Sequence, residues 1–189
     1  MVDITQLIEI RWHGRGGQGA VTSADLVARA AINEGKFAQA FSSFGPERRG
    51  APVSASVRID SKNPIRVRAE IAEPDVVVVL DLGLLHTANI TSGLKENGVL
   101  IVNTKKSFQA IELEFKVTQE LAIVDATKVA REELGINIVN TSMVGALIKA
   151  TGVVELASLV EPLQHRFGRL AERNVNAMER AYEATLVRG

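Results

Sequence analysis

Cysteine is absent from the 189 residues of this chain. The chain therefore cannot form a disulfide, hold an iron–sulfur cluster through thiolates, or use a cysteine nucleophile. Histidine is scarce as well, and the three histidines, His13, His86 and His165, are widely separated. We therefore expect no metal site, and we assign no catalytic residue.

Long apolar runs are also lacking. No stretch of about 18 apolar residues occurs, so we expect no membrane span. Asp3 and Glu9 interrupt the apolar character of the N-terminus, which does not resemble a signal peptide. A cytoplasmic protein is the default expectation.

The chain has no overall excess of positive or negative charge, because its formal net charge is +0. Bulk charge therefore gives no argument for nucleic acid or membrane as a partner. The charge is nevertheless uneven: residues 11–68 hold ten Lys or Arg against four Asp or Glu, a local net of +6. This favours an anionic ligand or an acidic partner near the first third, with ordinary surface variation as the alternative.

Apolar residues make up 46% of the chain, which is enough to form a hydrophobic core. We expect residues 1–189 to form one domain. The chain opens as a strand, a glycine turn, a helix and a second strand near 36–41, which is a βαβ unit. Continuous apolar runs at 74–81, 98–103 and 121–127 predict strands covered on both faces.

Two further segments, 53–59 and 65–69, alternate apolar and polar residues and predict a hairpin. Helices are predicted after the glycine turn, near 127–134, over 141–151 and from residue 154 onward. Thr141 or Ser142 is the candidate N-cap of the 141–151 helix. The sum is a Rossmann-like, doubly wound, mostly parallel α/β sheet with a β-hairpin addition and C-terminal helices.

The segment RWHGRGGQGA (residues 11–20) follows the first predicted strand, and Gly14, Gly16 and Gly19 fit the pattern G-x-G-x-x-G. Glycine permits positive φ and close backbone approach, and the amides that open the next helix favour an anion. A tight turn that simply packs well is the alternative, but four glycines in six residues exceed what a turn needs. A ligand or subunit contact is therefore favoured, with Arg15 and Gln18 over the turn.

The rest of a dinucleotide fingerprint is missing. An Asp or Glu should end the second strand, but that strand ends QAFSSFG. No Gly-Lys-Ser/Thr follows the loop, so a nucleoside triphosphatase is excluded as well.

Three other polar residues lie at strand ends. We expect His13 to hydrogen-bond the loop backbone rather than to act as a base, and Asp81 and Asp125 to cap the helices that follow.

Together, IEIRWHGRGGQGAVTSADLVARAA and QAFSSFGPERRGAPVSASVRI resemble the γ subunit of the 2-oxoacid:ferredoxin oxidoreductases, most closely the pyruvate synthase type. The resemblance continues through EPDVVVVLD, IVNTKKS, AIVDAT, NTSMVGALIKATG and ERNVNAMERAYE, and so covers nearly the whole chain. It implies a subunit, inactive alone, of a complex that converts a 2-oxoacid to acyl-coenzyme A and CO2 while reducing ferredoxin.

The resemblance also implies the division of labour. Thiamine diphosphate, Mg and [4Fe–4S] clusters are expected in the α, β and ferredoxin-like δ subunits, and no cofactor in this chain alone. We predict that Gly14, Arg15, Gly16, Gly17, Gln18 and Gly19, with Arg48 and Arg49 of GPERRG, line a cavity that receives coenzyme A. The motifs leave open whether the loop contacts coenzyme A or a neighbouring subunit. A pure assembly subunit and an independent nucleotide-binding regulatory module are the alternatives.

Overall fold

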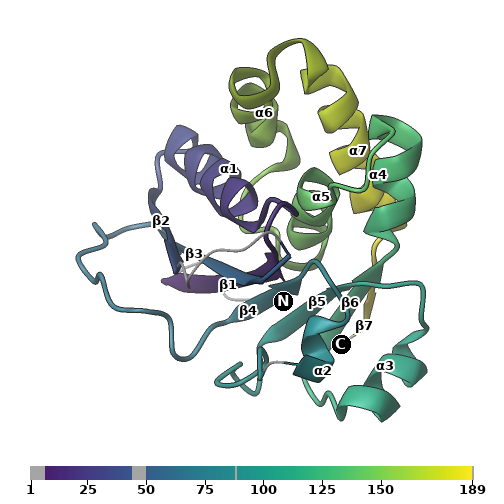
Figure 1. Ribbon diagram of the computed structural model, residues 1–189. Helices are drawn as coiled ribbons and strands as arrows, with labels where there is room; N and C mark the ends of the chain where they lie inside the picture. Colours follow the sequence, from purple (N-terminus) through teal and green to yellow (C-terminus); the bar gives the residue numbers. More distant parts are fainter. Residues whose placement is uncertain (1–6, 44–49, 88, 189) are drawn as a thin grey trace.

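The computed structural model describes residues 7–43, 50–87 and 89–188, and one mixed sheet of seven strands organises them (Figure 1). The strands lie in the order β2-β3-β1-β4-β5-β6-β7. Their bounds are β1 Ile8–Arg15, β2 Phe37–Ser43, β3 Pro52–Asp60, β4 Val76–Val79, β5 Val99–Asn103, β6 Glu120–Val124 and β7 Leu186–Arg188.

Strands β1, β4, β5 and β6 are parallel neighbours, as the Rossmann-like expectation requires. Strand β3 lies between β1 and β2 and is antiparallel to both, so β1 and β2 point the same way without touching. The predicted α/β class is confirmed. The unit formed by β1, α1 and β2 therefore differs from a simple βαβ unit, because β3 lies between its two strands.

The hairpin predicted between residues 53–59 and 65–69 does not form. Residues 53–59 do form a strand, but β3 pairs with β2 and β1, whereas residues 65–69 join no ladder. Both edges of β3 are already paired, with β1 and β2, so no edge is left for residues 65–69, and the guanidinium of Arg58 instead donates to the carbonyl oxygens of Val67 and Ala69. A side chain thus occupies the carbonyls that a hairpin partner would have used.

Helices cover the sheet unevenly. Helices α1, α4, α5, α6 and α7 lie on one face, whereas α2 and α3 lie below the sheet in Figure 1. The bounds are α1 Ala20–Asn33, α2 Leu84–Thr87, α3 Phe108–Phe115, α4 Ala126–Leu134, α5 Asn140–Thr151, α6 Val160–Phe167 and α7 Ala171–Ala184, with short 3-10 turns η1 Leu156–Leu159 and η2 Gly168–Leu170.

Helix ends follow the sequence signals with one exception. Asp125 caps α4 by accepting from the Lys128 amide at 2.9 Å, and Gly135 ends that helix with a φ of 73°. Helix α5, however, begins at Asn140, so Thr141 and Ser142 lie inside its first turn and cap nothing. Their side chains are buried against neighbouring elements, and burial overrides the capping preference there.

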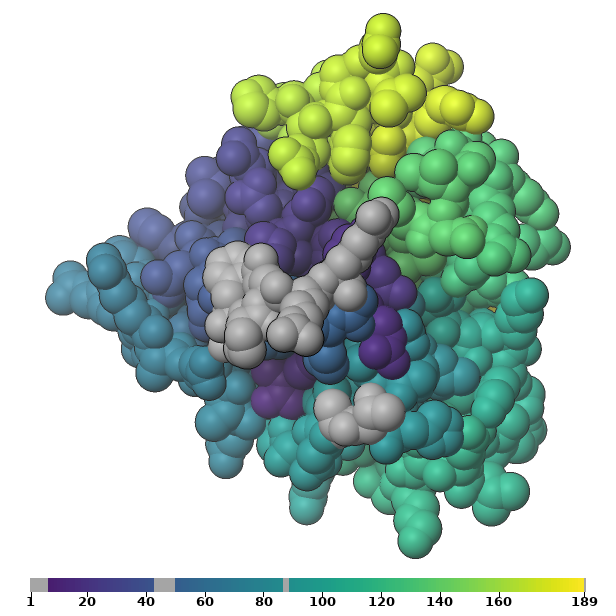
Figure 2. Space-filling model, viewed as in Figure 1, coloured from purple at the N-terminus to yellow at the C-terminus, as the bar shows by residue number. Residues whose placement is uncertain are grey.

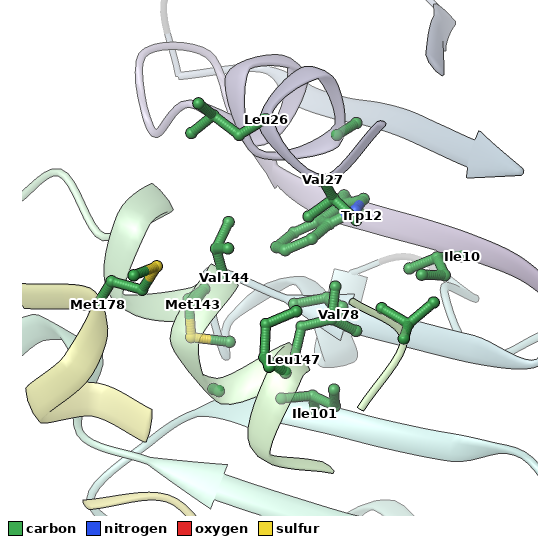
Figure 3. Packing of buried hydrophobic residues seen from close by; sticks show 14 of the residues in the cluster. Ile10, Trp12, Leu26, Val27, Val78, Ile101, Met143, Val144, Leu147 and Met178 are labelled. Atoms are coloured by element: carbon green, nitrogen blue, oxygen red, sulfur yellow. The ribbon is translucent and has the colours of Figure 1, made fainter. Parts of the chain in front are cut away.

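The larger core lies between the sheet and the α1, α5 and α7 layer (Figure 3). Trp12 of β1 is fully buried and faces Val27 of α1, with Leu147 of α5 close by. Helices α5 and α7 approach closely because Gly145 has no side chain; a Cβ there would lie 2.1 Å from the Met178 carbonyl oxygen. A smaller apolar cluster lies under α2 and α3 on the other face.

No helix within the described residues has the length and apolar character needed to cross a lipid bilayer.

Candidate functional site

The glycine loop joins β1 to α1 at the carboxyl end of β1. Strand β1 runs on through Gly14 and Arg15, which pair with Val53 and Pro52 of β3. On its other side β1 neighbours β4, whose chain continues to Leu80 and Asp81. In open α/β sheets, ligands bind at this edge of the sheet, where neighbouring connections run in opposite directions. The predicted loop therefore occupies the expected place.

Much of the loop's hydrogen-bonding capacity is used internally. The Gln18 amide donates to the Arg15 carbonyl at 3.0 Å, and the Arg15 amide donates to Gln18 Oε1 at 2.7 Å. The Gly16 amide donates to the Ala51 carbonyl at 2.9 Å. These three amides are therefore not available to a phosphate. The amides that open α1 are the donors suited to an anion, because the first turn of a helix has no internal acceptors for them.

Two glycines adopt backbone conformations that other residues rarely adopt. Gly17 has a φ of 96°, is exposed, and has open space where a Cβ would lie. Gly19 has a φ of 86°, and a Cβ there would lie 2.8 Å from the Cβ of Asn140 in α5. Gly19 thus allows the loop to pack on α5, whereas Gly17 offers bare backbone to an outside partner.

Asp81 braces the loop. Its Oδ2 accepts from Arg15 Nε at 2.8 Å and lies 3.4 Å from Gln18 Nε2. Its Oδ1 accepts from the Gly83 amide at 2.8 Å, next to the start of α2. Asp81 thus holds the turn before α2, near its predicted capping position, and it also compensates the charge of Arg15. Arg15 lies at the site, but its guanidinium is already paired.

A cavity of about 530 Å³ opens beside the loop, along the carboxyl ends of β4, β5 and β6. Asn103 crosses this edge, donating to the Leu80 carbonyl at 3.0 Å and contacting Thr127 Oγ1 at 2.9 Å. Cationic side chains line its rim, with Lys106 paired to Glu114 and Arg131 to Asn137. The lining residues are Gln18, Leu80, Asp81, Leu82, Asn103, Thr104, Lys105, Lys106, Asp125, Thr127, Arg131, Asn137 and Val139.

Sequence reasoning did not assign Asn103, Lys105 or Thr127 to a site. The available signal was their position, because each lies at or just after the end of an apolar strand, at the edge where α/β ligands bind. Among the predicted site residues, the structure brings Arg15 and Gln18 together, and Asp81, which was expected only to cap a helix, joins them. Arg48 and Arg49 lie outside the described residues, and their role stays a prediction.

His13 is placed differently from the expectation. Its Nε2 accepts a hydrogen bond from Arg11 Nε at 3.2 Å, so its partner is a side chain and not the loop backbone. Burial, and then the charge of Arg11, lower the pKa of His13 to about 4. The imidazole is therefore neutral at pH 7. It lines a second cavity of about 420 Å³ with Arg11, Ser54 and Ser56, on the sheet face opposite α1.

Comparisons with known proteins agree with one another. Residues 9–184 match the family model described as pyruvate ferredoxin/flavodoxin oxidoreductase. The chain is 55% identical over 183 residues to the pyruvate/ketoisovalerate oxidoreductases common subunit gamma of Thermococcus kodakarensis, covering 96% of this chain and 98% of that one. It is 47% identical over 178 residues to pyruvate synthase subunit PorC of Methanothermobacter thermautotrophicus, covering 94% and 95%.

A solved structure is similar to this chain in its fold as well as in its sequence. The crystal structure of pyruvate oxidoreductase subunit PORC from Thermotoga maritima superposes with a TM-score of 0.88 at 38% identity. The match covers 97% of this chain and 99% of that one.

Proposed function

The chain belongs to the pyruvate ferredoxin/flavodoxin oxidoreductase family as a gamma subunit of an oxidoreductase complex, and on this premise we propose that its complex oxidises pyruvate. Pyruvate would lose CO2, its acetyl group would pass to coenzyme A, and two electrons would pass to ferredoxin. The names of the relatives from Methanothermobacter and Thermotoga support pyruvate as the 2-oxoacid.

Partner subunits of the α, β and ferredoxin-like δ types hold thiamine diphosphate, Mg and the [4Fe–4S] clusters in this proposal. The residues of the chain support that division, because it has no cysteine to ligate iron. Among the described residues, no group of three His, Asp or Glu side chains is arranged to hold a metal ion. We place the complex in the cytoplasm and treat residues 1–189 as one domain, since one sheet links all the described helices.

The role of this chain is to position coenzyme A at the cavity shared with the catalytic subunits. The observation that carries this role is Gly17, an exposed residue of positive φ with open space above it. The amides that open α1 lie next to it and suit a phosphate of the coenzyme A tail. Gly14, Arg15, Gly16, Gln18 and Gly19 shape and brace this surface, and Arg48 and Arg49 are proposed to add charge. Catalysis by such positioning requires no reacting group from this chain.

A dinucleotide-binding module is the weaker alternative. No acid occurs in β2, and β2 is not next to β1, because β3 occupies the neighbouring position. A ribose-binding acid at the end of the adjacent strand, which such sites use, is therefore lacking. Co-purification decides between these classes. The oxidoreductase complex would be brown and active with pyruvate, whereas the alternative would be a colourless chain that binds NAD.

Gly17→Ala in the assembled complex tests the coenzyme A contact. We expect the KM for coenzyme A to rise about tenfold or more, because a methyl group would obstruct charge-assisted hydrogen bonds to phosphate. Gly35→Ala is the matched control: Gly35 also has a positive φ, 79°, and open space, but lies at the far end of α1. Both variants bear similar backbone strain, so only the position differs.

The outcomes separate the two roles left open by the motifs. A changed KM for coenzyme A in Gly17→Ala alone supports the ligand contact. Failure of Gly17→Ala to assemble, with Gly35→Ala assembling normally, assigns the loop to a subunit contact. An unchanged KM in an intact complex contradicts the proposal. The same titration with the Arg48→Ala, Arg49→Ala variant tests the two arginines.

A further inference from the structure

Residues 61–69 form a basic segment that follows β3 and pairs with no strand. The sequence SKNPIRVRA contains Lys62, Arg66 and Arg68 and no acid. Its alternation is that of a strand, yet the structure gives it no ladder partner. Figure 1 shows the connection from β3 to β4 leaving the sheet as a long trace without arrows, and Figure 2 shows blue residues protruding at the left margin, away from the yellow and green helices.

One edge of this segment is fastened to the sheet. Arg58, only 2% exposed, donates through Nη2 to the Ala69 carbonyl at 2.7 Å and through Nη1 to the Val67 carbonyl at 3.4 Å. Glu9 Oε1 accepts from Arg58 Nε at 2.7 Å, and the guanidinium lies 4.9 Å from the centre of the Phe41 ring. Carbonyls two residues apart point the same way in an extended chain, so Arg58 holds the segment extended along one edge.

The opposite edge is open. In an extended chain the backbone groups of Arg66 and Arg68 lie on the edge opposite the carbonyls of Val67 and Ala69, and within the described part of the chain neither residue makes a hydrogen bond or ion pair. Both side chains are exposed, and Val67 is 52% exposed. A held, extended backbone with one unpaired edge is a template for another strand.

We propose that residues 65–69 pair, through the open edge at Arg66 and Arg68, with an exposed strand edge of a partner subunit that bears acidic side chains. Charge complementarity selects this occupant, because three cations in nine residues repel a basic edge and attract an acidic one. In this pairing the backbone hydrogen bonds provide the affinity, and the two arginines provide the specificity for an acidic partner. The inference rests on the proposed function only in requiring that the chain works inside a multi-subunit complex.

Hydrogen exchange of the wild-type chain, alone and in the assembled complex, tests the pairing. We expect the amides of residues 65–69 to exchange at least about tenfold more slowly in the complex, because strand pairing protects them. Equal exchange in an intact complex would overturn this inference and leave the gamma-subunit assignment standing. Protection in the isolated chain that grows with its concentration would make the occupant a second copy and overturn the partner assignment. If no complex forms at all, the proposed function fails first.

Two variants separate backbone pairing from charge. Arg68→Pro removes the amide on the open edge, and the residue before a proline keeps an extended backbone. Arg68→Ala removes the same charge but keeps the amide. We expect Arg68→Pro to weaken association by about tenfold or more and Arg68→Ala by about threefold or less, given the small contribution of exposed charges. Equal losses, with both isolated variants retaining the wild-type circular dichroism spectrum, would overturn the backbone pairing.

Discussion

The two sides of strands β1 and β3 are built by different means. On the α1 side, Ile10, Trp12 and Val57 are fully buried in an apolar core beneath helices. On the other side the alternate residues are polar, and two arginines, Arg11 and Arg58, donate to backbone carbonyls of the segments that cross the strands. Helices α2 and α3 cover only the β4–β6 part of that face.

The difference shows how a sheet face without a helical cover is closed. Arg11 donates to the carbonyls of Ile71 at 3.3 Å, Ile90 at 2.7 Å and Ser92 at 2.8 Å. Loops bring carbonyl groups that need partners once they are buried, and a guanidinium offers five donors in a fixed geometry. Packing therefore stabilises one side of β1, and directional hydrogen bonds to loops stabilise the other.

The largest effect is expected on the packed side. Trp12→Ala removes a fully buried indole between β1 and α1 and should lower the free energy of unfolding by about 3–5 kcal/mol. Denaturant unfolding followed by far-ultraviolet circular dichroism measures this loss, since Trp12 is the single tryptophan. A loss below about 1 kcal/mol would mean that the packed side is not the main source of stability.

A smaller loss is expected on the polar side. Arg58→Met leaves Glu9 without its partner and removes the donors to Val67 and Ala69, which should cost about 2–4 kcal/mol. Adding Glu9→Gln should restore part of this loss, because the unpaired charge is removed. Arg29→Met, at an exposed pair with Asp25, serves as the control and should cost less than about 0.5 kcal/mol. Equal losses at Arg58 and Arg29 would contradict the special role of the buried pair.

The smallest expected effect is a pH dependence of stability, which arises from His13 on the polar side of β1. The folded pKa of His13 is about 4, below its ordinary value of 6.5, so the unfolded chain binds the proton more readily. Stability is therefore unaffected above pH 6.5 and falls as pH drops toward 4, by about 1–2 kcal/mol between pH 7 and 5. His13→Asn should reduce this pH dependence in urea titrations at both pH values. An unchanged pH dependence would place its origin elsewhere.

Much of the fold was predictable because it rests on local patterns. The buried strands β4, β5 and β6 are continuous apolar runs, and Gly135 and Gly152 end their helices with positive φ, a common way for a helix to end. The partner of a strand is not a local property. Alternation at 65–69 predicted a strand, but β1 and β2 take both edges of β3, and Arg58 then donates to the carbonyls of Val67 and Ala69 instead.

The site was predicted in position more than in detail. The glycine spacing located the loop at the correct sheet edge, and no neighbouring residue in the sequence indicated that Asp81 would pair with Arg15 across 66 positions. The same holds for Gln18, whose side chain turns back to the Arg15 amide. Such contacts depend on how β1 and β4 are placed side by side, which no short motif encodes.

The insertion of β3 between β1 and β2 also determines the order of events during biosynthesis. Strand β1, Ile8–Arg15, is made first, but both of its neighbours, β3 at Pro52–Asp60 and β4 at Val76–Val79, come much later. At about 5–20 residues per second, β4 is complete roughly 3–13 s after β1. Until β3 is complete, roughly 2–9 s after β1 at the same rate, Ile10 and Trp12 have no neighbouring strand to pair with, and the nascent chain exposes them as apolar residues that a chaperone can shield.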